Sequence, residues 1–345
     1  MSRLDEVRLM TKIARMYYVQ SIRQQEITER LGIHQSTVSR LLKKARETNL
    51  VRISVAAPSG IFPDLEDALQ EKFGLHEAVV VDCPAEEVAM VRDLGAATAF
   101  FLETTLKPKM IVGISSWSRA LFAMVEALHP GDSAHGGKVV QILGGVGNVN
   151  TLYQATQLAQ RLADLVGASP VLLQAPGIVG SADAKKVLSA DPAVRVASDL
   201  FDSVDLALVG IGSLEPSKLL ASSGNTFSLK ERAELRSQGA VGDICFRFFD
   251  RDGQLVKSPL MNRVIGIEPT SLKRTRRVVG VAGGARKVNA IFAALRGQWI
   301  NVLITDKRTV ESLLSMEKSN SFAEASAAIP KESGRRQQRN RSLST

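Results

Sequence analysis

The sequence predicts an α/β protein with two folded domains: an N-terminal winged helix-turn-helix over residues 1–57 and a doubly wound, Rossmann-like domain over residues 58–316. In the first domain, apolar residues recur at helical spacing and a short alternating segment follows. Beyond a Pro-Ser-Gly breaker at 58–60, β-rich apolar runs alternate with helical segments, which is typical of a mostly parallel sheet. Residues 317–345, rich in Ser and Ala and then in Arg and Gln, are expected to form a disordered basic tail.

Three helices and one strand are expected in the first domain. Apolar spacing predicts a helix over residues 5–19 and a shorter one over 24–30. Gly32 suits a tight turn before a third helix at 34–46, because glycine accepts positive φ. The segment 50–55 alternates apolar and polar residues, so we expect it to form the wing strand.

The polar face of the third helix carries side chains that can bind DNA. Gln, Ser and Arg can hydrogen-bond to base edges, whereas Lys suits phosphates. The residues expected at this surface are Gln35, Ser36, Thr37, Ser39, Arg40, Lys43 and Lys44. Residues 1–57 contain 11 Lys or Arg and 5 Asp or Glu, an excess of +6, whereas residues 58–330 carry −1. We therefore expect the first domain to bind double-stranded DNA, with a three-helix bundle that contacts proteins as the alternative.

The second domain is expected to contain seven strands. They are predicted at 78–81, 110–114, 139–143, 171–173, 206–211, 277–281 and 301–304. Helices are predicted between them, including those at 63–73, 87–104, 119–127, 154–165 and 286–296. Ligands of doubly wound sheets bind at the carboxyl ends of the strands. Small residues follow five of these strands, so backbone N–H groups there could approach an anion or a sugar hydroxyl.

Several motifs, taken in order along the chain, resemble the SorC family of sugar-binding transcriptional regulators, which is related to the DeoR group. They are the helix-turn-helix at 24–46, VVQILGGVG at 139–147, APGIV at 175–179, GIGS at 210–213, GAVGDICFRFFDRDG at 239–253, VVGVAGGARKVNAIFAAL at 278–295 and INVLITD at 300–306. The resemblance implies a sugar-isomerase-type effector domain, an operator-DNA partner and a homo-oligomer, either a dimer or a tetramer. It also implies a sugar, polyol or phosphosugar inducer and a role in regulating carbohydrate or polyol metabolism.

The resemblance places the inducer near Asp243 and Lys287. A carboxylate can accept hydrogen bonds from vicinal hydroxyls, and an ammonium can bind a phosphate or hydroxyl. The loop after 110–114 departs from the family because Ser118 replaces an expected Gly. Either Arg119 compensates as a charged clamp or the ligand carries no phosphate; Trp117 could stack on a sugar or belong to the core. The full set of expected effector-binding residues is Ser115, Ser116, Trp117, Arg119, Gln141, Gly144, Gly145, Asp243 and Lys287.

Other features argue against an enzyme. The four His residues do not fall at strand ends with partners, and no Ser-His-Asp, metal-ligand or phosphate-loop spacing appears. We therefore expect no catalytic residues, no metal and no cofactor. The alternative is a sugar-phosphate isomerase-like enzyme with an appended DNA-binding head. A purely structural DNA-binding protein would not explain the glycine-rich strand ends.

The sequence also gives expectations about location. No uninterrupted apolar run reaches 18 residues, so no membrane helix is expected, and the N-terminus lacks the apolar core of a secretory signal. Cys83 and Cys245 are isolated in the sequence. This usage fits a reducing compartment, so we expect a cytoplasmic protein without a membrane partner.

Overall fold

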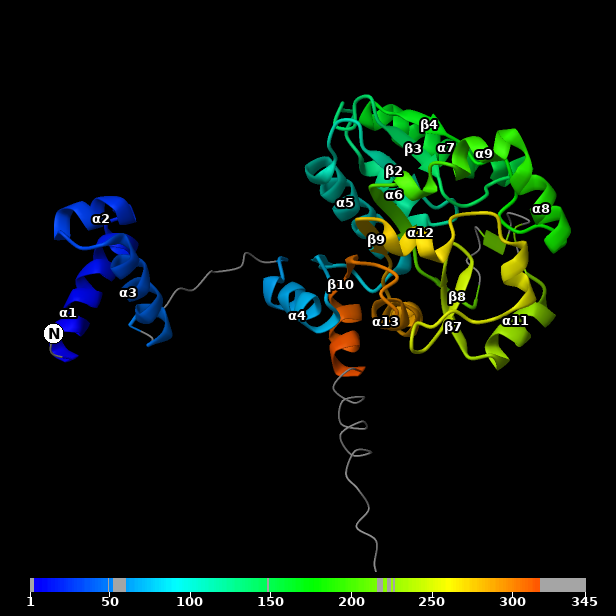
Figure 1. Ribbon diagram of the computed structural model, residues 1–345. Helices are drawn as coiled ribbons and strands as arrows, with labels where there is room; N and C mark the ends of the chain where they lie inside the picture. The colour runs from blue at the N-terminus through cyan, green and yellow to red at the C-terminus, as the bar shows by residue number, and fades with distance from the viewer. Residues whose placement is uncertain are drawn as a thin grey trace, which may run out of the picture. The chain divides into compact units, whose positions relative to one another are not determined.

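The computed structural model describes residues 3–48, 50–51, 60–147, 149–215, 220–221, 225 and 227–316. The chain divides into two compact units, Met1–Pro58 and Ser59–Thr345 (Figure 1). Most of the expected wing, apart from Leu50 and Val51, and the whole expected tail lie outside the described residues.

The first unit is helical. It contains α1 (Arg3–Ala14), the π-helical turn η1 (Arg15–Val19), α2 (Gln24–Leu31) and α3 (Gln35–Glu47). The prediction of a single α-helix over 5–19 was wrong for its last part, because residues Arg15–Val19 form a π-helical turn. This turn brings buried Met16 and the partly buried Tyr17 and Tyr18 against the same core. Gly32, with a φ of 62°, ends α2 as expected, and its N–H donates to the carbonyl of Thr28.

A seven-stranded parallel sheet forms the centre of the second unit. Its spatial order is β1 (Glu77–Val81), β10 (Val302–Asp306), β9 (Arg277–Val281), β5 (Leu206–Gly210), β2 (Ile111–Ile114), β3 (Lys138–Gln141) and β4 (Ser169–Val171). All the expected strands are present, although β4 begins two residues earlier than predicted. From β2 the chain moves outward through β3 and β4, then returns to β5 on the other side of β2. The carboxyl ends of β2 and β5 therefore meet where the strand order reverses, which is the usual ligand position in such sheets.

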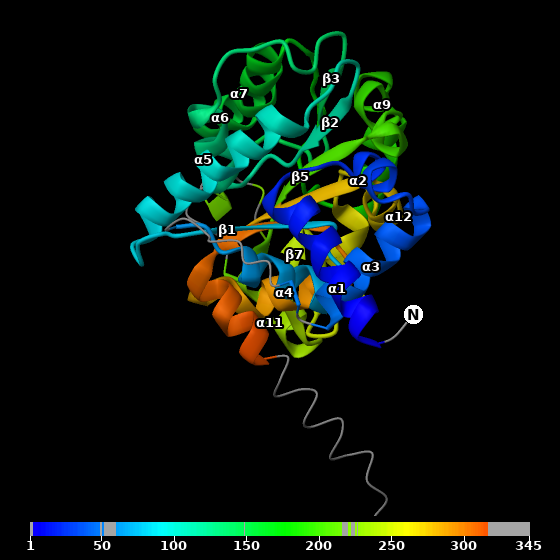
Figure 2. The ribbon, with the colours of Figure 1, turned by 90° about the vertical axis from the view of Figure 1, so that its left-hand side faces the viewer.

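Helices cover both faces of this sheet (Figure 2). One face packs against α5 (Glu87–Thr105), α6 (Arg119–Ala127) and α7 (Val149–Val166), and the other against α4 (Pro63–Phe73) and α13 (Val288–Arg296). Alternate residues of β5 enter the two cores: Leu206 and Leu208 face the first group, Ala207 and Val209 the second. This burial on both faces explains why the strands read as continuous apolar runs.

A second, antiparallel sheet was not expected from the sequence. It consists of β6 (Gly212–Ser213), β7 (Ala240–Ile244) and β8 (Arg247–Asp250). The residues expected to be a simple turn after β5 therefore form a strand. Further elements are α8 (Ala182–Ala190), α9 (Pro192–Ser198), η2 (Phe201–Ser203), α11 (Leu229–Ser237), η3 (Pro259–Arg263), α12 (Pro269–Arg274), η4 (Ala285–Lys287) and a helix at 307–316. Among the helices described, none combines the length and the apolar character needed to cross a membrane.

Helices α5 and α6 approach each other closely at Gly95. A Cβ atom at this position would lie 2.6 Å from both the carbonyl carbon and the Cβ atom of Ala123. Because α5 and α6 both begin at the carboxyl edge of the sheet, this contact fixes the spacing of two helix N-termini there.

Replacing Gly95 by alanine should lower stability. The substitution gains about 1 kcal/mol of helix propensity, but overpacking two helices costs roughly 1–3 kcal/mol. We expect a lower urea midpoint for Gly95→Ala. The control is Gly131→Ala, where a Cβ atom would meet nothing within 4 Å, and it should change stability by less than about 0.5 kcal/mol. A midpoint for Gly95→Ala at or above that of the wild type would contradict the close contact.

Candidate functional site

Helix α3 separates a buried face from an exposed polar one. Its buried residues are Val38, Leu41, Leu42 and Ala45. Among the residues predicted to contact DNA, Gln35, Ser36, Ser39, Arg40 and Lys43 are exposed and Thr37 is half-buried. The exposed side chains offer both hydrogen-bonding groups and positive charge on one surface.

Lys44 differs from the other predicted DNA-binding residues. Its Nζ atom lies 2.7 Å from Oε1 of Glu6 in α1, and both side chains are partly exposed. This hydrogen bond and charge lower the pKa of the Glu6 carboxyl. In the described structure, Lys44 therefore links α3 to α1.

The loop after β2 crosses the end of β5. The Ser115 N–H donates to the Leu208 carbonyl at 3.0 Å, and the Gly210 N–H donates to Ser115 Oγ at 3.4 Å. Ser118 caps α6, since its Oγ accepts from the Leu121 N–H. The hydroxyls of Ser115 and Ser118 thus shape the loop.

The backbone of this loop holds a row of unbonded donors. The N–H groups of residues 116–120 make no hydrogen bond within the part of the chain that the structure describes, although Ser116, Ser118 and Ala120 are buried. Buried N–H groups normally have acceptors. Successive free N–H groups at the start of a helix form a binding position for an anion or a polar oxygen.

Two other predicted residues join neighbouring strands. Gln141, only 2% exposed, donates from Nε2 to Ser116 Oγ at 2.8 Å and accepts from the Leu173 N–H at 3.1 Å. The Ser116 hydroxyl donates to the Leu143 carbonyl at 2.7 Å. These bonds tie the ends of β2, β3 and β4 together, so both side chains hold the site in shape.

The glycines of the 144–145 turn allow its backbone to lie close to the backbone of Pro176. A Cβ atom on Gly144 would lie 2.4 Å from the Pro176 carbonyl oxygen, and Gly145 forms a bridge with Pro176. Trp117 Nε1 donates to the Gly144 carbonyl at 3.3 Å, and the Trp117 side chain packs against the core. The structure therefore brings this turn against residues 175–177.

Asn225 was not singled out from the sequence, yet it fastens this region. The side chain is 1% exposed; its Oδ1 accepts from the Gly177 N–H at 2.7 Å, and its Nδ2 donates to the Val146 carbonyl at 3.0 Å. Nothing in the local sequence distinguishes it from an ordinary loop asparagine.

Asp243 lies beside the end of β5 because β7 pairs with β6. Gly212 faces it in the ladder, and a Cβ atom there would lie 2.0 Å from Asp243 Oδ1. The Phe246 N–H donates to Asp243 Oδ2 at 3.1 Å. Burial raises the pKa of Asp243 to about 6, although this hydrogen bond and the Lys287 ammonium each lower it.

Lys287 lies within electrostatic reach of both Asp243 and Arg119. Burial lowers the pKa of Lys287, the Asp243 carboxylate opposes that shift, and Arg119 adds to it. Within the described chain, the Lys287 ammonium makes no hydrogen bond or ion pair. Arg119, the first residue of α6, is paired with Glu87, the first residue of α5. The structure thus brings Asp243, Lys287 and Arg119 together beside the row of free N–H groups.

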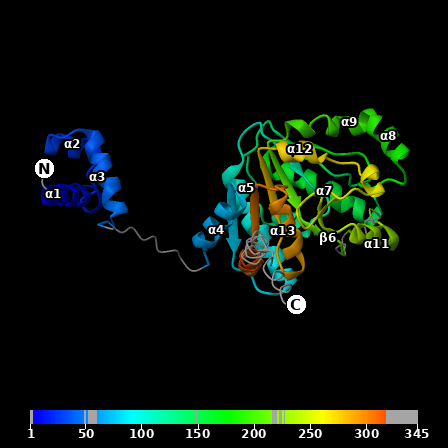
Figure 3. The ribbon, with the colours of Figure 1, turned by 60° about the horizontal axis from the view of Figure 1, so that its bottom comes forward.

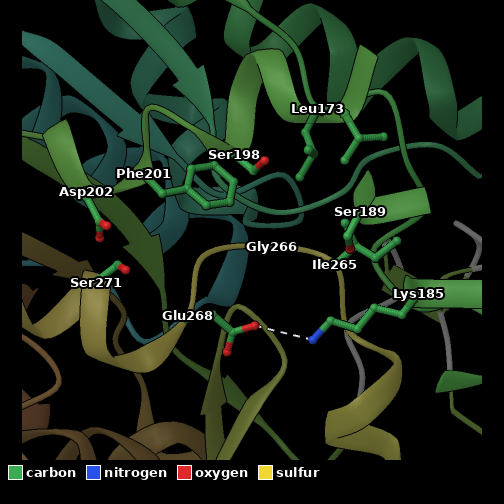
Figure 4. A pocket seen from close by; sticks show the side chains of 11 residues that line it. Leu173, Lys185, Ser189, Ser198, Phe201, Asp202, Ile265, Gly266, Glu268 and Ser271 are labelled. Carbon is green, nitrogen blue, oxygen red and sulfur yellow. Dashed lines mark hydrogen bonds and ion pairs between the residues drawn. The ribbon is translucent and has the colours of Figure 1, made fainter. Parts of the chain in front are cut away.

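A separate cavity of about 230 Å³ is lined by none of the predicted residues (Figure 4). Lys185 and Glu268 form an ion pair across one part of it at 3.3 Å. The buried Arg247 also lies 2.9 Å from Glu268. Because these charges have partners, this cavity is less suited to an anion than the loop after β2.

Comparisons with known proteins agree with this arrangement. Residues 62–315 match the family model described as "Putative sugar-binding domain". The deoxyribonucleoside regulator of Bacillus subtilis is 35% identical over 312 residues, covering 90% of this chain and 98% of that protein. The sorbitol operon regulator of Klebsiella pneumoniae is 33% identical over 317 residues, covering 91% and 100%.

Solved structures match as well. The crystal structure of full-length SorC from Klebsiella pneumoniae superposes with a TM-score of 0.68 at 33% identity, covering 90% of this chain and 99% of that one. A domain of the transcriptional regulator DeoR from Pseudomonas syringae pv. tomato matches with a TM-score of 0.59 at 38% identity, covering 74% and 100%.

These relatives regulate transcription and are not enzymes, so the expectation of a regulator is confirmed. The similarity extends over the helical N-terminal unit as well as the parallel α/β unit. The chain belongs to the SorC family, related to DeoR, of transcriptional regulators with a sugar-binding domain.

Proposed function

We propose that the protein is an operator-binding regulator whose affinity for DNA is switched by a phosphorylated sugar or polyol. The observation that carries this proposal is the row of N–H groups at residues 116–120, which, like the nearby Lys287 ammonium, have no hydrogen-bond partner among the described residues. These groups can receive the oxygens of a phosphate, while Asp243 accepts hydrogen bonds from sugar hydroxyls. The match of residues 62–315 to a family model described as a sugar-binding domain supports such a ligand.

In this proposal α3 is the recognition helix of a winged helix-turn-helix. Gln35, Ser36, Ser39 and Arg40 read base edges, and Lys43 binds phosphate. Thr37 and Lys44 are further contacts. One such module contacts too little DNA for high specificity, so a homodimer or homotetramer sets the spacing of the half-sites. The regulator acts in the cytoplasm, where its operator lies.

The relatives define which ligands to examine first. One is named for sorbitol and another for deoxyribonucleosides. A thermal-shift panel of sorbitol, sorbitol 6-phosphate, deoxyribose 5-phosphate and a deoxyribonucleoside tests the ligand class, because a ligand that binds the native state raises its melting temperature. Stabilisation by the unphosphorylated compounds alone would contradict a phosphate-binding loop.

Arg40→Ala should weaken operator binding by about 10- to 100-fold, since a paired contact with a base contributes roughly 1–3 kcal/mol. The measurement is fluorescence anisotropy with an operator selected from random DNA. Arg195→Ala is the matched control, because it removes an exposed, ion-paired arginine from α9 and should leave affinity unchanged. An unaltered affinity of both Arg40→Ala and Gln35→Ala would refute α3 as the reading helix.

Lys287→Gln and Asp243→Asn should abolish the response to the stabilising panel compound while operator affinity without ligand stays normal. The physical reason is that each variant removes one group that meets the ligand. Lys185→Gln serves as control, since it disrupts the ion pair across the other cavity. A lost response in Lys185→Gln with a normal one in Lys287→Gln would move the ligand to that cavity.

The affinity for a sugar without a titratable group, such as sorbitol, should depend on Asp243 ionisation. Burial raises the pKa of Asp243 to about 6, and hydroxyl donors favour its charged form. Affinity should therefore be constant above pH 6 and fall by up to about tenfold per pH unit below it. Isothermal titration calorimetry on the wild type and Asp243→Asn measures this. A pH dependence that persists in Asp243→Asn would assign it to another group.

A further inference from the structure

A buried carboxylate holds the loop that carries Lys287. Asp306 ends β10 and is 4% exposed. Its Oδ1 accepts from the Thr309 N–H at 3.0 Å, and its Oδ2 accepts from Thr309 Oγ1 at 2.5 Å and from the Gly284 N–H at 2.8 Å. Asp306 thus caps the helix at 307–316, as many aspartates do, and additionally binds a loop from another strand.

The loop is shaped around this carboxylate. A Cβ atom on Gly283 would lie 2.4 Å from Asp306 Oδ2, and Gly284 has a φ of 90°, which L side chains rarely adopt. The Thr309 hydroxyl also accepts from the Gly284 N–H at 2.9 Å. The Lys287 N–H donates in turn to the Gly284 carbonyl at 2.9 Å. A plain helix cap would need none of these loop contacts, which connect Asp306 to Lys287 through Gly284.

The residue that follows Asp306 contacts the start of the second unit. The residue after Asp306, Lys307, places its Nζ atom 4.9 Å from the centre of the Phe62 ring. Phe62 precedes α4, and its carbonyl accepts from the N–H groups of Leu65 and Glu66. The helix at 307–316 and α4 lie side by side in Figures 1 and 2, and Figure 3 shows the same helix next to α13.

We propose that Asp306 is the positioning residue for Lys287 and that it transmits ligand occupancy through Lys307 to Phe62, where the chain enters the second unit. This inference rests on the proposed function, because it assumes that Lys287 meets the ligand. A ligand that displaces Lys287 displaces Gly284, and Gly284 and the first turn of the helix at 307–316 share one carboxylate. A ligand that shifts the conformation of the loop at Lys287 therefore also shifts the conformation around Phe62.

Hydrogen exchange of the full-length protein, followed by mass spectrometry, tests the path without DNA or sugar. Asp306→Asn replaces an acceptor of three donors by an amide, and Thr309→Val removes the hydroxyl with little change of shape. Both should accelerate amide exchange about tenfold or more in peptides covering 282–288 and 60–66. Phe62→Leu keeps apolar packing, removes the ring under Lys307 and, by reciprocity, should accelerate exchange in 282–288.

The control is Asp191→Asn, because Asp191 caps α9 by accepting from the Ala193 N–H at 2.8 Å. It should accelerate exchange only in α9. The proposal would be overturned if amide exchange in 282–288 or in 60–66 stayed unchanged in both Thr309→Val and Asp306→Asn. It would also be overturned if these variants accelerated exchange in β5 and α9 as much as in the two peptides, because that result indicates global destabilisation. Failure of the proposed function is recognised separately, by a wild type that binds no operator or responds to no panel compound.

Discussion

The hydrogen bonds of Ser115 hold the two halves of the parallel sheet together where the strand order reverses. Its N–H and its hydroxyl are both used by β5, so the following backbone turns away from the sheet. As a result, the N–H groups of residues 116–120 have no acceptor in the described chain. An unbonded buried donor costs roughly 1–3 kcal/mol. Side-chain hydrogen bonds of Gln141, Ser116 and Asn225 stabilise the surrounding loops and offset the free-energy cost of these unbonded donors.

Buried charge is handled in two ways in this domain. Arg247 shares Glu268 with Lys185, and Asp306 is surrounded by N–H and O–H donors. The ion pair with Glu268 and the donors around Asp306 offset part of the cost of burying these charges. Lys287 differs from them, because within the described residues its buried ammonium makes no hydrogen bond or ion pair. Charges left in this condition are typical of sites that receive a ligand.

The sequence predicted the parallel sheet well because strands buried on both faces leave long apolar runs. It could not predict β6, since two residues such as Gly212 and Ser213 carry no period. The glycines at 144–145 suited either a tight turn or the approach of a ligand, and the sequence could not show that Gly144 fits against Pro176. The contacts of Asn225 and Asp306 were also hidden, because their partners lie far away along the chain. Asp243 and Lys287 were identified through family resemblance, and spacing alone would not have selected them.

A ligand can switch a regulator only by binding one conformation better than another, and a tenfold preference needs about 1.4 kcal/mol. Filling one or two of the free N–H groups at 116–120 is worth about that much, since each bond contributes roughly 1 kcal/mol. In the proposed regulator, one or two such bonds are enough to drive a switch if they form in one conformation and not in the other. Rigid parts are needed to convert that free energy into a displacement elsewhere. The close contact of α5 with α6 at Gly95 and the carboxylate of Asp306 supply them, since both resist small local adjustments.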